Sequence, residues 1–360
     1  MNPEELVKFM GADGPAHVFH SAAYYEAPDA PQMPLKGWLG ADLVFDIDAD
    51  HFDLPCQKQH DSWWCLDCNH REHGSRPNQC PKCSSTRIKA LNWMCEECLA
   101  KSKEEAIKII ENFLIPDMGI SKKDIIAVFS GHRGYHIHTF TPELHHLGSQ
   151  ERREIVDYVS GTGIDFRYHG FVDNTYGVPK GPDSQSPGWE RKIAEGIRQL
   201  FQNPQQLSHI PGLRANQIKI LQKDAKAISK QLNEVPPHYI TPKGVGQKTW
   251  YTIAQYVIES YAAIVDEPVT TDIHRLIRLP GSLHGKTGFL VKHLKVSDLE
   301  DFDPFSQAQV FSGTVTIRIS DSPEFTLNGE YYPPMHEIKK ELPLSAAMLL
   351  LCKGVAKLVT

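Results

Sequence analysis

Two aspartates close an apolar run near the start of the sequence, in a pattern that suits divalent cations. Residues 41–48 read ADLVFDID, and the apolar stretch predicts a buried strand. Side chains two positions apart on a strand point to the same side, so Asp46 and Asp48 can bind the same cations. Two carboxylates this close repel each other unless a cation lies between them, which favours Mg²⁺ or Mn²⁺. Asp-x-Asp is also common in solvated turns, and the preceding strand is what favours the metal site here.

Groups that bind anions follow in the segment SGHRGYH, residues 130–136. Its two glycines let backbone N–H groups approach an anion closely. Ser130, Arg133 and His136 add side-chain donors suited to phosphate oxygens. The alternative is an ordinary glycine-rich hairpin turn with a paired arginine.

A second acidic and basic cluster lies in the segment VDEPVTTDIHRLIRLPGSLHGKTG, residues 265–288. Asp266 stands at an expected helix-to-strand junction. Arg275, Arg278, His284 and Lys286 follow it as cationic or proton-donating groups. An acidic residue beside several anion-binding groups is what a nucleoside triphosphate with two metal ions requires.

Six of the eight cysteines form three Cys-x-x-Cys pairs, which in a reducing compartment favour metal over disulfides. The spacing of one set is typical of a four-thiolate zinc ribbon: Cys65, Cys68, Cys80 and Cys83. A second zinc set, with the ribbon nested inside it, would use Cys56, His60, Cys95 and Cys98. The alternatives are one zinc held by a different four of these ligands, or plain core cysteines. Three further histidines could compete as ligands: His51, His70 and His73.

The composition is that of a globular protein with a sizeable core. The chain has 360 residues, of which 41% are hydrophobic and 23% charged. Its net charge of −6 excludes a uniformly basic nucleic-acid coat but not local basic patches. The longest apolar run, 346–352, is too short to cross a bilayer, and the N-terminal residues show no signal pattern. We therefore expect a cytoplasmic protein without a membrane segment.

Hydrophobic periodicity places these motifs on regular elements. Helices are expected at 4–12, 101–114 and 249–263, where apolar residues recur at helical spacing. Strands are expected at 125–131 and 135–140, joined by a hairpin turn at 131–134, with His136, His138 and Phe140 on one face.

Residues 190–232 differ from the rest of the chain. They combine helical periodicity with eight Lys or Arg and three acidic residues, a net charge of +5. This segment is either a solvated helix surface or a track for nucleic-acid phosphates.

The motifs together resemble a known family. DIDAD at 46–50, the Cys-x-x-Cys and helix at 95–114, SGHRGYH at 130–136 and RLIRLPGSLHGKTG at 275–288 follow the order seen in the catalytic small subunit of archaeal and eukaryotic DNA primases. The resemblance implies an α/β (α+β) fold, with a prim-type mixed-sheet core, a zinc-binding insertion and an inserted helical subdomain. The expected ranges are a discontinuous core at 1–52, 99–182 and 250–342, the zinc insertion at 53–98, the helical subdomain at 183–249 and a tail helix at 343–360.

The resemblance also implies a reaction and roles for the residues. The reaction would be template-directed synthesis of short primers from nucleoside triphosphates on single-stranded DNA during replication. Asp46, Asp48 and Asp266 resemble the family's metal-binding catalytic carboxylates, which take two Mg²⁺ or Mn²⁺ ions. The groups that would bind the incoming triphosphate are Ser130, Arg133, His136, Arg278, His284 and Lys286. One or two structural Zn²⁺ ions are expected beside them.

Two departures from the family pattern stand out. His132 occupies a position where many relatives have a second arginine, and the ribbon at 65–83 resembles an insertion in a shorter family zinc motif. The ribbon's role, whether it contacts template or a partner or braces the fold, is therefore not inherited.

The family implies a partner, and two other functions compete with the primase. The small subunit of relatives works with a large subunit that carries an iron–sulfur cluster, so we expect a heterodimer. Once the cysteine pairs are assigned to zinc, no four-cysteine set is left for a cluster here. The rival functions are a repair primase-polymerase with the same carboxylates and a non-catalytic zinc-ribbon subunit that binds nucleic acid.

Overall fold

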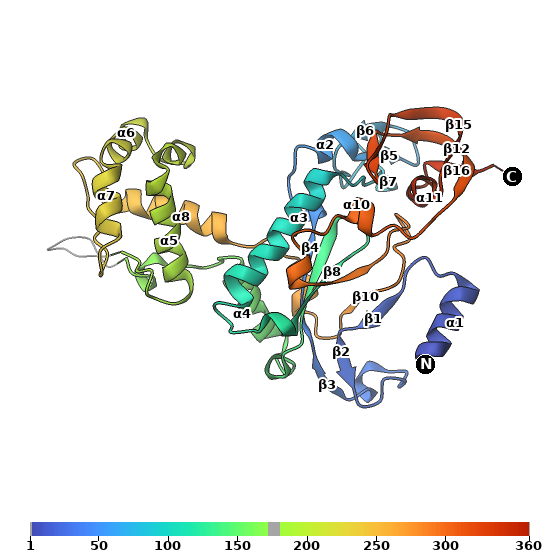
Figure 1. Ribbon diagram of the computed structural model, residues 1–360, viewed down its shortest axis with the longest axis horizontal. Coiled ribbons are helices and arrows are strands. Elements are labelled where there is room, and N and C mark those ends of the chain that lie inside the picture. Colours follow the sequence, from blue (N-terminus) through green and yellow to red (C-terminus); the bar gives the residue numbers. More distant parts are fainter. Residues whose placement is uncertain (1, 172–180, 360) are drawn as a thin grey trace. The chain divides into compact units, whose positions relative to one another are not determined.

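The computed structural model describes residues 2–171 and 181–359 (Figure 1). It divides into two compact units. Unit 1 contains Met1–Ile107, Ile120–Arg153 and Ile264–Thr360, and unit 2 contains Lys108–Gly119 and Glu154–Ala263. Unit 2 therefore extends on both sides of the 183–249 range expected for a helical subdomain. Residues 172–180, which were expected in the core, lie outside the described residues.

A four-stranded sheet forms the centre of unit 1. Its strand order is β11 (Lys292–Lys295), β8 (Ile125–Phe129), β9 (Gly134–Thr139) and β4 (Leu43–Asp48). All three pairings are antiparallel, so this sheet is not the mixed one that the resemblance implied, although the α+β class is confirmed. Strands β8 and β9 form the expected hairpin. The side chains of Phe45, Ile47 and Ile137 are fully buried, which fixes the register of β4 against β9.

Two short strands bring distant segments together beside this sheet. β1 (Phe19–Ser21) pairs with β10 (Leu276–Arg278), so that Phe19 lies opposite Arg278. The nearby elements are α1 (Pro3–Asp13), β2 (Ala23–Tyr25), β3 (Trp38–Ala41) and α9 (Glu267–Thr271). Asp266 is the N-cap residue of α9, so it precedes a short helix where a strand was expected.

Residues 53–98, the range expected for a zinc-binding insertion, form a small sheet with its own core. Its elements are α2 (Gln57–His60), β5 (Ser62–Cys65), β6 (Arg71–His73) and β7 (Ile88–Leu91), with β5 in the middle of the sheet. Trp63 and Ile88 pack there with Cys65 and Cys80. Helix α3 (Glu96–Ile109) follows and continues as a π-helical turn at Ile110–Leu114, so it starts earlier than the expected 101–114.

The C-terminal part of unit 1 forms a second sheet with a helix. The strands are β12 (Thr314–Ser322), β15 (Met335–Pro343) and β16 (Ala356–Leu358), and the hairpin β13 (Phe325–Leu327) and β14 (Glu330–Tyr332) precedes β15. Helices α10 (Pro304–Gln307) and α11 (Leu344–Lys353) complete this part. Gly354 ends α11 in the left-handed conformation with φ 73°, and β16 follows, so the expected tail helix stops at residue 353. In Figure 1 this C-terminal part of unit 1 lies next to the segment 53–98. The rings of Trp93 and Phe325, one from each segment, are 5.7 Å apart.

Unit 2 is helical. Its first part, Lys108–Gly119, holds the end of α3 and the π-helical turn. The second half of α4 (Ser149–Val159) follows, then α5 (Gly188–Gln202), α6 (Ala215–Lys223), α7 (Ala225–Leu232) and α8 (Gln247–Tyr261). Helices α5 and α8 pack closely at Gly196, where a Cβ would lie 2.3 Å from Val257 Cγ1. No helix within the described residues has the length and apolar character needed to cross a membrane.

Candidate active site

The acidic residues of the site are positioned by β4 and the segment that follows α8. Asp46 and Asp48 lie on one face of β4, opposite His136 and Gly134 of β9. The backbone N–H of Asp266 donates to the carbonyl oxygen of Asp46 at 2.9 Å, which fixes Asp266 beside the strand. His136 Nε2 lies 3.5 Å from Asp46 Oδ1. The pairing with β9 thus places the predicted carboxylates next to a predicted phosphate ligand.

The electrostatics at Asp46 fit a cation site. Burial, followed by repulsion from Asp48 and Asp266, raises the pKa of Asp46 to about 7. Burial also raises the pKa of Asp48, against the nearby charge of Arg133. Like charges brought together in this way are relieved by a bound divalent cation, and carboxylate oxygens suit Mg²⁺ or Mn²⁺. The three aspartates therefore fit the metal ions implied by the resemblance.

A cavity of about 830 Å³ opens above these carboxylates. Its wall includes every predicted catalytic and triphosphate-binding residue except Asp266: Asp46, Asp48, Ser130, Arg133, His136, Arg278, His284 and Lys286. These residues come from three separate segments of the sequence. The fold thus gathers acidic residues and anion donors around one space of a size typical for small-molecule sites.

Two glycines let the segment 130–136, which carries anion donors, pack closely against the segment 275–286 and against β4. A Cβ on Gly131, where φ is 82°, would lie 2.6 Å from the Cβ of His284. A Cβ on Gly134 would lie 2.2 Å from the carbonyl oxygen of Ile47. Thr287 Oγ1 also donates to the carbonyl oxygen of Gly131 at 2.5 Å. Any larger residue at either glycine would push the 130–136 turn away from its neighbours.

The histidines in the cavity are neutral hydrogen-bonding groups. Burial lowers the pKa of His284 to about 2 and that of His136 well below its ordinary value. Arg278 supplies a permanent positive charge: its guanidinium lies 2.8 Å from His17 Nδ1 and packs on the ring of Phe19. The site therefore combines neutral ring donors with fixed cations.

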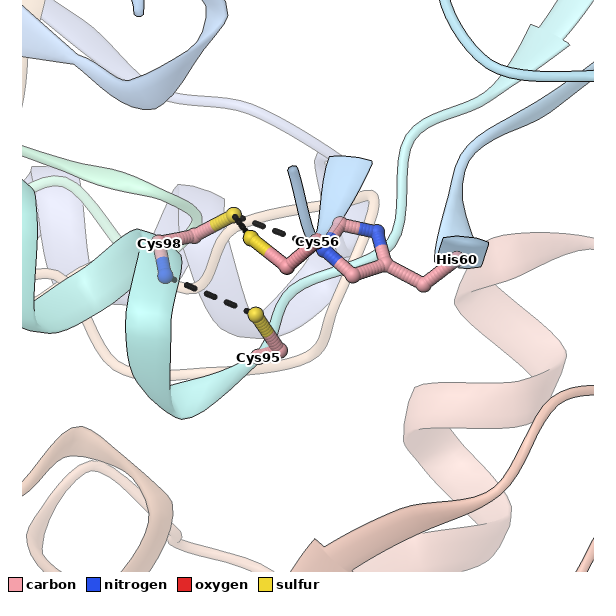
Figure 2. A group of neighbouring side chains, drawn as sticks. All are labelled: Cys56, His60, Cys95 and Cys98. Atoms are coloured by element: carbon pink, nitrogen blue, oxygen red, sulfur yellow. Dashed lines mark hydrogen bonds between the residues drawn. The ribbon is translucent and has the colours of Figure 1, made fainter. Parts of the chain in front are cut away.

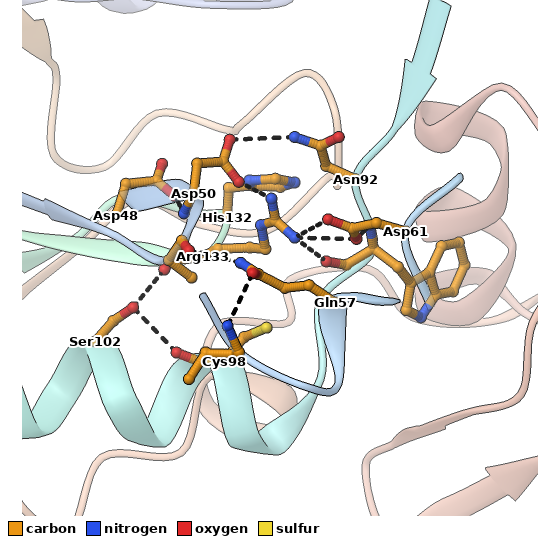
Figure 3. A network of polar contacts seen from close by, with 12 residues as sticks. Asp48, Asp50, Gln57, Asp61, Asn92, Cys98, Ser102, His132 and Arg133 are labelled. Carbon is orange, nitrogen blue, oxygen red and sulfur yellow. Dashed lines mark hydrogen bonds and ion pairs between the residues drawn. The ribbon is translucent and has the colours of Figure 1, made fainter. Parts of the chain in front are cut away.

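Arg133 is held by protein groups at the edge of the cavity (Figure 3). Its guanidinium donates to both carboxylate oxygens of Asp61, at 2.8 and 3.0 Å, and to the carbonyl oxygen of Trp93, and it forms an ion pair with Asp50. The backbone N–H of Asp50 donates in turn to Asp48 Oδ1 at 3.0 Å. Through Asp50, Arg133 thus connects residues 53–98 to Asp48, one of the predicted catalytic carboxylates.

The same eight Cys and His side chains that the spacing indicated form two groups that could hold zinc. In each group the ligand atoms lie within 4.8 Å of one another: Cys56, His60, Cys95 and Cys98, and Cys65, Cys68, Cys80 and Cys83. Neighbouring sulfur atoms are 3.5 to 3.6 Å apart, close to the separation of about 3.8 Å that Zn–S bonds of about 2.3 Å give in a tetrahedron. His51, His70 and His73 belong to neither group.

The first of these groups is built around the start of α3 (Figure 2). Cys98 Sγ lies 3.5 Å from His60 Nε2, and the other ring nitrogen of His60 lies 2.8 Å from Asp61 Oδ1. A carboxylate on the far side of a ligating imidazole is the usual arrangement at zinc sites, where it fixes the ring and its tautomer. Because Asp61 also accepts from Arg133, this group and the cavity share one carboxylate.

Several residues of the site could not have been selected from the sequence. His17 lies in a connection without periodicity, and Lys353 lies at the end of a helix more than sixty residues beyond the last motif, yet Lys353 lines the cavity. Arg275 also lines the cavity, although the family resemblance assigns it no role. The pairings of Asp50 and Asp61 depend on tertiary contacts that no spacing rule reveals.

Comparison with known proteins gives the family. The model of the family described as "DNA primase small subunit" matches residues 45–296. This chain belongs to that family. It is 35% identical to the DNA primase small subunit PriS of Methanothrix thermoacetophila, over 98% of this chain and 86% of the relative. It is 35% identical to that of Methanosarcina acetivorans, over 99% and 84%, and 30% identical to that of Nitrosopumilus maritimus, over 98% and 85%. The chain is accordingly a small catalytic primase subunit.

Proposed function

We propose that this chain synthesises short primers on single-stranded DNA from nucleoside triphosphates for DNA replication, by two-metal nucleotidyl transfer, with a primase large subunit as its partner. The observation that carries this proposal is the shared cavity, in which acidic strand β4 faces the donor segments 130–136 and 275–286. Family membership supports the reaction class and the partner.

Asp46, Asp48 and Asp266 would bind two Mg²⁺ or Mn²⁺ ions. When bound, such ions lower the pKa of the primer 3′-hydroxyl and stabilise charge on the leaving pyrophosphate. The 3′-hydroxyl gives its proton to solvent and its oxygen forms a bond to the α-phosphorus of the incoming nucleotide. The bond from that phosphorus to the oxygen bridging the α- and β-phosphates breaks, and pyrophosphate leaves with the bridging oxygen. Because the primer hydroxyl attacks, no side chain has to act as a nucleophile.

The anion donors would hold the triphosphate in line for this attack. Ser130 and the neutral rings of His136 and His284 donate hydrogen bonds, while Arg278 and Lys286 offset negative charge. The predicted contact of Arg133 with the triphosphate stays a prediction. Such a contact would require the exposed Asp50 to release the guanidinium of Arg133. The side chain of Arg133 has an exposed fraction of 1%.

The experiment uses the purified chain, alone and with its large subunit, on unprimed single-stranded DNA with labelled nucleoside triphosphates and Mg²⁺ or Mn²⁺. We expect short labelled oligomers from the wild type. We expect a loss of at least about a thousandfold in Asp46→Ala/Asp48→Ala, because metal-ion catalysis contributes several kcal/mol to the rate. Asp53→Ala is the matched control, since Asp53 is exposed and its one ion pair within the described residues is with the exposed Lys58.

A gapped, primed DNA substrate separates the primase from its rivals. Activity only on the primed substrate would instead support a repair polymerase. If the wild type and the double variant were equally inactive on both substrates, with zinc and the large subunit present, the chain would be a nucleic-acid-binding subunit.

A further inference from the structure

A lysine from the C-terminal helix reaches the cationic end of the cavity. Lys353 is the last residue of α11, and it lines the cavity together with Arg278, His284 and Lys286. Its Nζ lies 2.8 Å from His132 Nε2 and donates to the carbonyl oxygen of Asn92. Its ammonium also lies over the ring of Trp93, 5.8 Å from the centroid. These contacts leave one of the three ammonium hydrogens for another partner.

The charge of Lys353 has no carboxylate partner within the described residues. Asp61, the carboxylate whose charge acts on it most, is already paired with Arg133. Burial, followed by repulsion from Arg133, lowers the pKa of Lys353 to about 7. The charges of Lys353, Arg278 and Lys286 all contribute to the lowered pKa of His284, after burial.

Asp46 and Asp48 offset part of the charge of Arg278, and Asp48 also interacts with Lys286, whereas Lys353 has no such partner within the described residues. A largely buried cation without a counter-charge destabilises the folded protein. A polyphosphate that entered the cavity would supply the negative charge that Lys353 lacks. It would also accept hydrogen bonds from Lys353, Arg278 and Lys286. The position of Lys353 therefore suits an anion that the described part of the chain does not itself provide.

His132 explains how Lys353 is held. Burial, followed by the charge of Lys353, lowers the pKa of His132 well below its ordinary value, so the ring is neutral. An unprotonated Nε2 can accept from the ammonium, and the ring also stacks on His284 at a centroid distance of 5.2 Å and an angle of 11°. A cationic side chain at position 132 would instead repel Lys353.

We propose that Lys353 is a further triphosphate-binding residue, which donates from α11 to the β- and γ-phosphate oxygens of the nucleotide, and that His132 positions it. Lys353 lies outside residues 45–296, the part of the chain that the family model matches. The inference rests on the proposed function, because it names a ligand contact in the same cavity.

The first test compares Lys353→Met with wild type in nucleotide binding and in primer synthesis. We expect Lys353→Met to raise the KM for the nucleoside triphosphate and the Kd for ATP about tenfold, and to leave the Kd for AMP and for single-stranded DNA unchanged. Lys353→Arg should retain most of the binding of ATP. Lys357→Met, an exposed lysine on β16, is the matched control and should behave as wild type.

The second test uses the unaltered protein, so it does not depend on how the variant folds. Acylation of lysines by an amine-reactive ester, read by mass spectrometry, should be slowed at Lys353 by ATP with Mg²⁺ and not by AMP. Equal labelling of Lys353 with and without ATP, while Lys286 is protected, would overturn the inference and leave the proposed function intact. Weaker binding of DNA, with unchanged binding of ATP by Lys353→Met, would also overturn it. Failure of the wild type to make primers at all would instead count against the proposed function.

Discussion

The residues of the cavity show a conflict between function and stability. Asp46 is held beside two other carboxylates, although burial and their charges raise its pKa to about 7. At pH 8, where Asp46 is mostly ionised, that repulsion destabilises the folded protein relative to the unfolded chain, in which the carboxyl has its ordinary pKa. Protein sites that bind substrate or metal commonly carry such a cost.

Replacing this carboxylate by an amide should therefore stabilise the metal-free protein. We expect Asp46→Asn to raise the melting temperature in EDTA at pH 8 by about 2 °C, the shift that about 1 kcal/mol produces in a domain of this size. Addition of Mn²⁺ should raise the melting temperature of the wild type and not of the variant, because the variant lacks a metal ligand. Thermal melts by circular dichroism measure both. A lower melting temperature for Asp46→Asn in EDTA would show that the carboxylates do not repel each other in the folded state.

Single elements were predictable where the signal was local. The ribbon set follows from short spacings, and the second set from the free ligands nearest in sequence to the remaining Cys-x-x-Cys pair. Strands β4 and β8 follow from apolar runs, and β9 follows from the alternation of its residues. The predicted hairpin makes β8 and β9 antiparallel, but the directions of β4 and β11 in the sheet could not be predicted, because a buried strand has the same sequence pattern in either direction. The contacts of Arg133 with Asp61 and Asp50 join segments far apart in the sequence, so they had no local signal.

The two cysteine sets should bind zinc independently. We expect two zinc ions per wild-type chain, and one in each of the double variants Cys65→Ser/Cys83→Ser and Cys56→Ser/Cys98→Ser. The reason is that the ribbon has its own core around Trp63, whereas the other set is anchored on α3. Metal content after dialysis, measured by mass spectrometry, tests this. One zinc in the wild type, or loss of both ions in the α3 variant, would contradict it.

The link between the zinc insertion and the cavity should depend on Asp61. We expect Asp61→Asn to lower the free energy of unfolding by about 3 kcal/mol, because it removes the buried carboxylate that accepts two hydrogen bonds from the buried guanidinium of Arg133. The measurement is urea denaturation followed by fluorescence. The control is Asp67→Asn, which removes an exposed ion pair with Arg87 and should cost at most about 1 kcal/mol. Equal losses in the two variants would show that the buried pair has no special weight.

The described chain divides into two compact units that carry different functional residues. Unit 1 contains the cavity and both cysteine sets, whereas unit 2 carries the basic segment 190–232. The structure divides the cations of that segment by location. Lys192 is buried and paired with Asp117, and Arg191 pairs with the same carboxylate. The remaining exposed cations lie on or beside α6 and α7: Arg214, Lys219, Lys223, Lys226 and Lys230.

These exposed lysines make the phosphate-track hypothesis testable. We expect replacement of Lys219, Lys223, Lys226 and Lys230 by glutamine to weaken binding of single-stranded DNA and to flatten its salt dependence. If all four contact phosphates, the slope of log K against log salt should fall in magnitude by about 3, since each neutralised phosphate of a single strand contributes about 0.7. Fluorescence anisotropy of a labelled oligonucleotide over a range of salt concentrations gives this slope.

The control replaces four other cations by glutamine to match the change in net charge: Lys122, Lys123, Lys339 and Lys357, all exposed on unit 1. A phosphate contact is local, so the control should keep the wild-type slope, whereas a general effect of net charge would alter both variants alike. Primer synthesis at saturating template should persist in the α6–α7 variant, because none of its four substitutions lines the cavity. An unchanged slope in that variant would leave a solvated helix surface as the explanation of the basic segment.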